Sequence, residues 1–134
     1  MRLVKFRGKP IQMTLPSGEE LLGDFVVGNL ITHKDGVCRI LVPIDGGFEN
    51  YKVSPSTVSQ FTSLYDVSGK EIYEGDILDF NGLKIEVRFV RGVFALLCNG
   101  DLDNELCGDC RTDMFAKVIG NIHDNPELLK GGEE

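Results

Sequence analysis

Two cysteines in the C-terminal half, Cys107 and Cys110, have the spacing that most directly suggests chemistry. Two thiolates separated by two residues in a short turn can bind one metal ion, as they do in zinc knuckles. A structural zinc site needs two further ligands, and the chain offers only four scattered residues: Cys98, Cys38, His33 and His123. A single pair is a weak metal motif, so reduced cysteines in a loop and in the core are the alternative. We expect no cofactor.

An acidic segment lies just before this pair. Asp101, Asp103 and Glu105 alternate with other residues, as the oxygen ligands of a calcium loop do. A calcium loop also requires Gly at its sixth position and Glu at its twelfth, where this chain has Leu106 and Thr112. The pattern therefore predicts a solvated acidic loop in place of an ion site.

The N-terminal segment carries three basic residues at alternating positions, Lys5, Arg7 and Lys9. On a strand these three side chains would share one face, with Val4 and Phe6 on the other. Such a basic stripe could contact phosphates. It could equally be the charged solvent face of an edge strand, so both interpretations stay open.

The distribution of charge limits the nucleic-acid interpretation. The chain has 14 basic and 21 acidic residues, for a net charge of −7. Residues 1–60 hold 7 basic and 6 acidic residues, whereas residues 61–134 hold 7 basic and 15 acidic residues. Because phosphate attraction supplies nearly all non-specific nucleic-acid binding, nucleic acid is disfavoured as a partner of the second half and is an alternative only for the first.

No common catalytic motif is present in the sequence. The chain lacks the nucleophile elbow G-x-S-x-G, the phosphate loop G-x-x-x-x-G-K-[ST], the dinucleotide turn G-x-G-x-x-G and the metal pair H-E-x-x-H. His33 and His123 are the only histidines, and neither belongs to such a motif. We therefore predict that the protein is not an enzyme, with an active site recognisable only by its geometry as the alternative.

Apolar residues recur with a period of two more often than 3.6, which predicts strands. In Leu83–Phe89 every odd position is apolar and every even position is charged, so one face is expected to be buried and the other solvated. Asn81-Gly82 before this segment favours a type I′ turn, and Arg91-Gly92 separates it from the apolar run Val93–Cys98. Residues 77–98 are therefore predicted to form a three-stranded antiparallel meander.

Weaker patterns predict the remaining elements. Further strands are expected at Ile11–Thr14, Leu21–Thr32, Val37–Ile44, Phe48–Val53 and Met114–Ile122. Gly23 and Gly28 inside the second of these suggest bulges or bends. Ser54-Pro55 and Asn125-Pro126 each place a capping residue before a proline, which predicts one helical turn. The tail at residues 130–134 is expected to be disordered.

Together these elements predict a mostly β fold of antiparallel meanders with minimal helix. We expect an N-terminal β subdomain at residues 1–60 and a small, partly open SH3-like barrel in a C-terminal subdomain at residues 61–134, because closure hides strand edges. A sandwich of the two halves is the main alternative fold.

No apolar run approaches the roughly 20 residues that span a bilayer, and the N-terminus lacks the apolar core of a signal peptide. We therefore expect no membrane contact and a cytoplasmic location.

Three motifs bracket almost the whole chain. The central motif consists of Gln60–Leu64, Asp66 and Gly69–Ile77, and the closing motif is Val118–Leu129. With Lys5–Lys9 near the start, these motifs resemble those of the YopX family, and the central and closing ones are highly specific.

The chain departs from the family pattern at several places. Ser63 and Tyr65 stand where the family usually has Gly and Lys, and residues 10–59 and 98–113 match poorly. The cysteine pair and the acidic loop are therefore expected to be local to this protein, which weakens the metal interpretation further.

The resemblance implies a small β-rich protein that is encoded by phages and prophages, has no known function and offers no catalytic residues to carry over. We accordingly expect a non-enzymatic accessory protein in a bacterial host cell, which binds an unknown phage or host protein, its own copies in a homo-oligomer, or both. The alternative is a phage regulator that contacts nucleic acid through the basic N-terminal strand. Tyr73, Glu74 and Asp76 are the candidates for a partner-binding patch, although the same motif also suits a turn before a strand.

Overall fold

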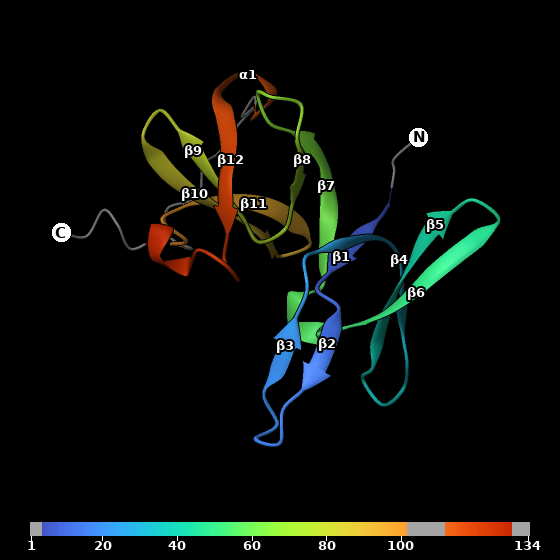
Figure 1. The fold of residues 1–134 in the computed structure, drawn as a ribbon. Coiled ribbons are helices and arrows are strands. Elements are labelled where there is room, and N and C mark those ends of the chain that lie inside the picture. The colour runs from blue at the N-terminus through green and yellow to red at the C-terminus, as the bar shows by residue number, and fades with distance from the viewer. Residues whose placement is uncertain (1–3, 102–111, 130–134) are drawn as a thin grey trace. The chain divides into compact units, whose positions relative to one another are not determined.

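The computed structural model describes residues 4–101 and 112–129, and its regular secondary structure consists almost entirely of antiparallel strands (Figure 1). The predicted mostly β fold with minimal helix is confirmed. Contacts between residues divide the chain into two units, Met1–Gln60 and Phe61–Glu134. We call these the first unit and the second unit. Within the described residues no helix is long and apolar enough to cross a bilayer.

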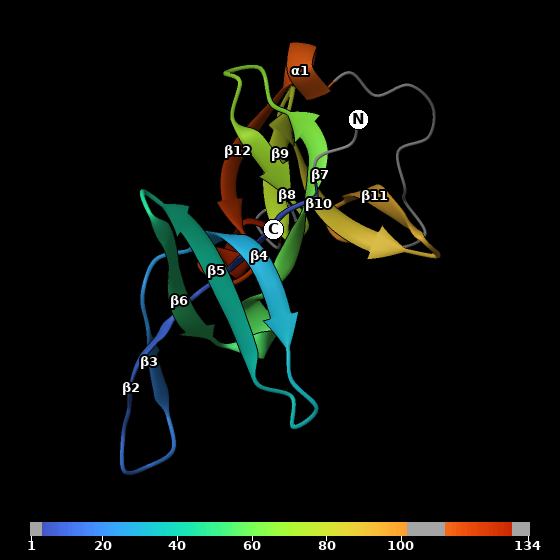
Figure 2. The ribbon, with the colours of Figure 1, turned by 90° about the vertical axis from the view of Figure 1, so that its right-hand side faces the viewer.

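The first unit contains most of one antiparallel sheet and a separate two-stranded ribbon. Its elements are β1 (Phe6–Gly8), β2 (Ile11–Thr14), β3 (Glu20–Leu22), β4 (Val26–Thr32), β5 (Cys38–Ile44), β6 (Gly47–Val53) and the short 3-10 helix η1 (Pro55–Thr57). In the sheet the strands follow the order β6-β5-β4-β1, and β1 also pairs with the start of β7 (Ser59–Tyr65). Strands β2 and β3 form the ribbon. Figure 2 shows β4, β5 and β6 running side by side.

One strand predicted in this unit is divided in the structure. The run Leu21–Thr32 forms two strands, β3 and β4, that pair with different partners. The chain leaves β3 at Gly23, where a Cβ atom would lie only 2.8 Å from Nε2 of Gln12. Glycine allows this close approach, so the bend expected within a single strand becomes a break between two.

The core of the first unit lies on one face of its sheet. Cys38, Ile40 and Val53 are buried there. Partly buried side chains pack around them: Phe6, Val26, Leu30, Val42, Tyr51 and Val58. Since side chains alternate between the faces of a strand, the residues between these positions belong to the opposite face of the sheet.

The second unit contains a four-stranded sheet and a two-stranded pair. Its elements after the start of β7 are β8 (Glu71–Tyr73), β9 (Asp76–Phe80), β10 (Leu83–Val90), β11 (Val93–Cys98), α1 (Thr112–Phe115), β12 (Ala116–Asn121) and the 3-10 helix η2 (Pro126–Leu129). The sheet has the order β11-β10-β9-β12, and the end of β7 pairs with β8. Among the described residues the sheets do not close into a barrel, which agrees with the partly open form that we expected.

The meander predicted for residues 77–98 is confirmed as β9, β10 and β11. Asn81 and Gly82 have φ angles of 54° and 88°, as a type I′ turn requires. Arg91 and Gly92 adopt similar positive φ angles, 50° and 84°. The helical turn predicted after Asn125 is also present, as η2.

The solvated face predicted for β10 is wrong at one residue. Ile85 and Val87 are buried as expected, within a cluster completed by Ile72, Leu78, Leu96 and Ala116. Glu86 is also buried, with only 5% of its surface exposed. The reason is that η2 packs against β10, so both faces of the sheet are covered at this point.

Candidate functional site

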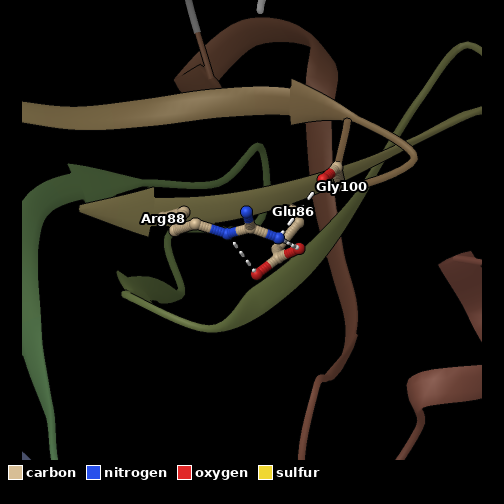
Figure 3. Close-up of polar contacts among 3 residues, drawn as sticks. All are labelled: Glu86, Arg88 and Gly100. Carbon is tan, nitrogen blue, oxygen red and sulfur yellow. Dashed lines mark hydrogen bonds and ion pairs between the residues drawn. The ribbon is translucent and has the colours of Figure 1, made fainter. Parts of the chain in front are cut away.

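An ion pair joins the buried Glu86 to the partly exposed Arg88 on β10 of the second unit (Figure 3). The two residues are two positions apart on the strand, so their side chains lie on the same face. Arg88 donates from Nη2 to Oε1 of Glu86 at 2.6 Å and from Nε to Oε2 at 3.1 Å. The hydrogen bond to Glu86 raises the pKa of Arg88 and outweighs the opposing effect of burial. Both carboxylate oxygens of Glu86 thus contact the same guanidinium.

The ion pair also holds the turn that follows β11. Arg88 Nη2 donates to the carbonyl oxygen of Gly100 at 3.2 Å (Figure 3). Gly100 has a φ angle of 74°, and a Cβ atom there would lie 2.7 Å from Oε1 of Glu86. This arrangement has the geometry of a structural anchor, with no carboxylate oxygen turned away from the guanidinium. The sequence did not single out Glu86 or Arg88, since their alternation with apolar residues resembles that of any solvated strand face.

Asp66 forms a second buried anchor in the same unit. Its Oδ1 accepts hydrogen bonds from the backbone N–H groups of Ser68 and Lys70, at 2.8 and 2.9 Å. Its Oδ2 accepts one from the N–H of Val118 on β12, at 3.0 Å. Burial alone would raise the pKa of Asp66, but the three backbone N–H groups stabilise the carboxylate and lower it. Asp66 therefore ties the turn after β7 to a strand 52 residues further along.

The exposed patch predicted from Tyr73, Glu74 and Asp76 is not formed. Tyr73 and Asp76 are buried, and only Glu74 is partly exposed. The tight turn between β8 and β9 brings Oδ2 of Asp76 to within 2.8 Å of the Tyr73 N–H. The Tyr73 ring lies 5.5 Å from that of Phe61, and its hydroxyl donates to Glu71. These side chains therefore stabilise the turn instead of facing solvent.

The basic N-terminal strand does not form the exposed stripe that the sequence suggested. Arg7 is buried, and its Nε donates to Oγ of Ser59 at 3.1 Å. Its guanidinium lies 4.1 Å from the centre of the Phe25 ring, and Nζ of Lys9 lies 5.0 Å from the same centre. The reason is topological: β1 lies between β4 and β7, so the expected edge strand is an interior one. Lys5 is partly buried.

The metal candidates are not brought together by the described residues. Cys107 and Cys110 lie outside them, as do most of the acidic positions between Asp101 and Thr112. Cys98 and Cys38 are buried free cysteines in different units. Across residues 4–101 and 112–129 no group of three His, Cys, Asp or Glu side chains could hold a metal ion.

The first unit has an open strand edge, which belongs to β6. Strand β6 pairs with β5 along its whole length. On its other side, the described residues provide only a bridge from Pro10 to Val53 at its C-terminal end. Two large apolar side chains at the β5–β6 hairpin are exposed, Ile44 on β5 and Phe48 on β6, the latter at 58%. Backbone groups along such an edge can pair with a further strand.

Comparison with known proteins gives a family and a structural relative. A family model described as YopX protein matches residues 31–130 of the chain. The crystal structure of protein EF1440 from Enterococcus faecalis is similar, with a TM-score of 0.54 and 25% sequence identity over 95% of this chain and 98% of that chain. No match was found among curated proteins. The resemblance seen in the sequence motifs is therefore confirmed, and the name of EF1440 describes no activity.

Proposed function

The chain belongs to the YopX family, and from this premise we propose that it is a non-enzymatic phage or prophage accessory protein that binds other proteins or its own copies. We place its action in the cytoplasm of a bacterial host. The observation that carries this proposal is the open edge of β6, because a strand edge with few partners offers a row of backbone donors and acceptors to a further strand.

Two other strand edges of the described residues, those of β8 and β12, are less suited to this role. Strand β8 is only three residues long. The outer side of β12 is engaged by the segment after β7, since Val67 donates to the carbonyl of Ala116 and Val118 donates to Asp66. In contrast, β6 presents seven residues with Phe48 exposed beside them.

The geometry does not favour nucleic-acid binding through the N-terminal strand. That alternative depends on Lys5, Arg7 and Lys9 facing phosphates from one exposed face. Arg7 is buried, and its guanidinium stacks on Phe25 while its Nε donates to Ser59. Its contribution to a phosphate-binding surface would require these contacts to be broken.

Two measurements test the proposal. Static light scattering at tens of micromolar protein gives the mass in solution, and we expect a dimer or larger assembly that Phe48→Glu dissociates. Phe89→Glu is the matched control, because Phe89 has similar exposure, 49%, but lies on β10 of the second unit.

Affinity capture from phage-carrying host cells, with and without nuclease, is the second measurement. A stoichiometric protein partner that survives nuclease supports the proposal. A strictly monomeric protein that recovers no partner contradicts it, and partners that are all lost on nuclease treatment indicate a nucleic-acid role.

A further inference from the structure

The sheet of the first unit has a second face, opposite its core. Residues directly opposite each other in an antiparallel pair lie on the same face. The register places Ile31 of β4, Arg39 of β5 and Lys52 of β6 in one row across three strands. Because side chains alternate along a strand, six further residues of these strands share this face. We call the nine residues the outer face: Val27, Asn29, Ile31, Arg39, Leu41, Pro43, Phe48, Asn50 and Lys52.

The outer face is largely exposed and combines four apolar side chains and one proline with two asparagines and two cations. Phe48 is 58% exposed, Ile31 is 40% exposed, and Val27 is exposed as well, while Leu41 is partly buried. The neighbouring row on the core face contains Leu30, Ile40 and Tyr51, all of which pack in the core. Apolar side chains therefore occupy both faces of these strands. Exposed apolar side chains that gather on one face of a sheet commonly mark an interaction site.

The charges of the outer face have a single sign. Arg39 and Lys52 lie directly opposite each other, and no acidic residue belongs to the face, although the whole chain has a net charge of −7. Arg39 donates one of its five guanidinium N–H groups to Oδ1 of Asn50 at 3.4 Å, and the planar guanidinium is well suited to bind a carboxylate. This combination of aliphatic, aromatic and cationic groups is complementary to a ligand that is both apolar and acidic.

We propose that the outer face binds an acidic, apolar segment of a partner protein. Its carboxylates would contact Arg39 and Lys52, and its apolar side chains would cover Ile31, Leu41 and Phe48. This inference rests on the proposed function and adds the surface and the class of partner.

The alternatives fit the outer face less well. Two copies joined through it would bring Arg39 and Lys52 of each against like charges. A single-stranded nucleic acid stacks its bases on aromatic rings, and Phe48 is the only aromatic residue of the face. The net charge of −7 also repels a polyanion.

Fluorescence anisotropy with defined probes tests the inference on the full chain. The probe is a labelled synthetic peptide in which Glu alternates with Leu, and we expect the protein to bind it. The double substitution Arg39→Glu with Lys52→Glu is expected to weaken this binding by at least about tenfold, because two attractive contacts become repulsive. Ile31→Ser should weaken it without any change of charge.

Lys34→Glu with Lys117→Glu is the matched control. These two lysines are exposed and lie outside the outer face, and the substitutions change the net charge by the same amount. Binding of the probe is expected to stay within about twofold of the unsubstituted protein. Circular dichroism verifies that each variant is folded. An equal loss of binding in the control would overturn the proposal, because only net charge would then matter.

Two other probes separate the remaining outcomes. A peptide with Lys in place of Glu must bind more weakly than the acidic one, and a labelled oligothymidylate must bind more weakly too. Preference for the oligothymidylate would replace the proposal with a nucleic-acid surface. If the acidic peptide does not bind while the protein still recovers its partner in affinity capture, only the outer face is excluded. If no partner and no self-association are found, the proposed function itself fails.

Discussion

The two units differ in how they treat the face of their sheet that lies opposite the hydrophobic core. Each contains an antiparallel sheet with one face in a hydrophobic core. In the second unit the other face is covered where η2 packs against β10, and Glu86 is buried there beside Arg88. In the first unit the other face remains exposed and carries Phe48, Ile31 and Val27. At these positions a charged residue is buried on the sheet of the second unit, whereas large apolar residues are exposed on the sheet of the first.

This contrast shows that the polarity of a strand face does not by itself determine its exposure. What covers a face depends on segments far away in the sequence. The four predictions that follow test whether this face of the sheet is covered in the second unit and exposed to solvent in the first. They run from the largest expected effect to the smallest.

Among the four tested substitutions, with their comparison variants set aside, Arg88→Met is expected to have the largest effect on stability, because it leaves the buried carboxylate of Glu86 without its cation. Removing one partner of a buried ion pair costs about 3–5 kcal/mol, and the partial exposure of Arg88 favours the lower end of this range. Urea denaturation followed by circular dichroism measures the loss. Lys117→Met removes an exposed cation from the same unit and is expected to cost less than about 0.5 kcal/mol. Similar losses in the two variants would show that this face is not sealed.

Gly100→Ala is expected to lower the free energy of unfolding by about 2 kcal/mol. The new Cβ atom combines an unfavourable positive φ angle with a clash against Glu86. Gly92→Ala is a matched control, since Gly92 has a φ of 84° but no atom within 4 Å of the added Cβ. It should lose only about 1 kcal/mol, from the φ angle alone. A difference of zero between the two would contradict the close approach of Gly100 to the ion pair.

Asp66→Asn is expected to cost about 1–2 kcal/mol at neutral pH, through weaker acceptance of three backbone hydrogen bonds. The pKa of Asp66 is lower in the folded protein than its ordinary value of about 3.9, so its carboxylate stabilises the fold above that value. This contribution is lost as the pH falls through the folded-state pKa. Thermal denaturation between pH 7 and pH 2 should therefore show a smaller acid-induced decrease in the variant. Parallel curves for the two proteins would exclude this role.

Ile31→Ser should have the smallest effect on stability, about 1 kcal/mol, because Ile31 is 40% exposed on the outer face and loses little beyond its β propensity. Ile40→Ser on the core face of the neighbouring strand is the comparison, and it should cost about 3 kcal/mol or more. Chemical denaturation of dilute protein measures both. A large loss for Ile31→Ser would mean that the outer face is covered in solution.

Much of the fold was predictable because it depends on local chemistry. Asn81-Gly82 accepts the positive φ angles of a type I′ turn, and this fixed the register of the meander in the second unit. Pro126 after Asn125 predicted the helical turn η2 for a similarly local reason. Both predictions required only neighbouring residues.

The side chains of the candidate sites were less predictable because distant segments decide their environment. Arg7 was expected on a solvent face, but pairing of β1 with both β4 and β7 places it in the interior. Glu86 was expected in solvent, but η2 covers it. Tyr73 and Asp76 resemble surface residues of a turn, yet they bond to each other and are buried. Pairing and packing between segments that are distant in the sequence cannot be inferred from the residues next to each position.

The bond between Asp66 and Val118 has a consequence for the order of events during synthesis. The turn at Asp66, Ser68 and Lys70 can close as soon as those residues are made, but Oδ2 must wait for a strand 52 residues later. The pairs of the first unit, by contrast, are all available once Gln60 has been made. The growing chain therefore passes through a stage in which all strands that pair within the first unit have been made. At that stage the Oδ2 atom of Asp66, in the second unit, still lacks the N–H group of Val118.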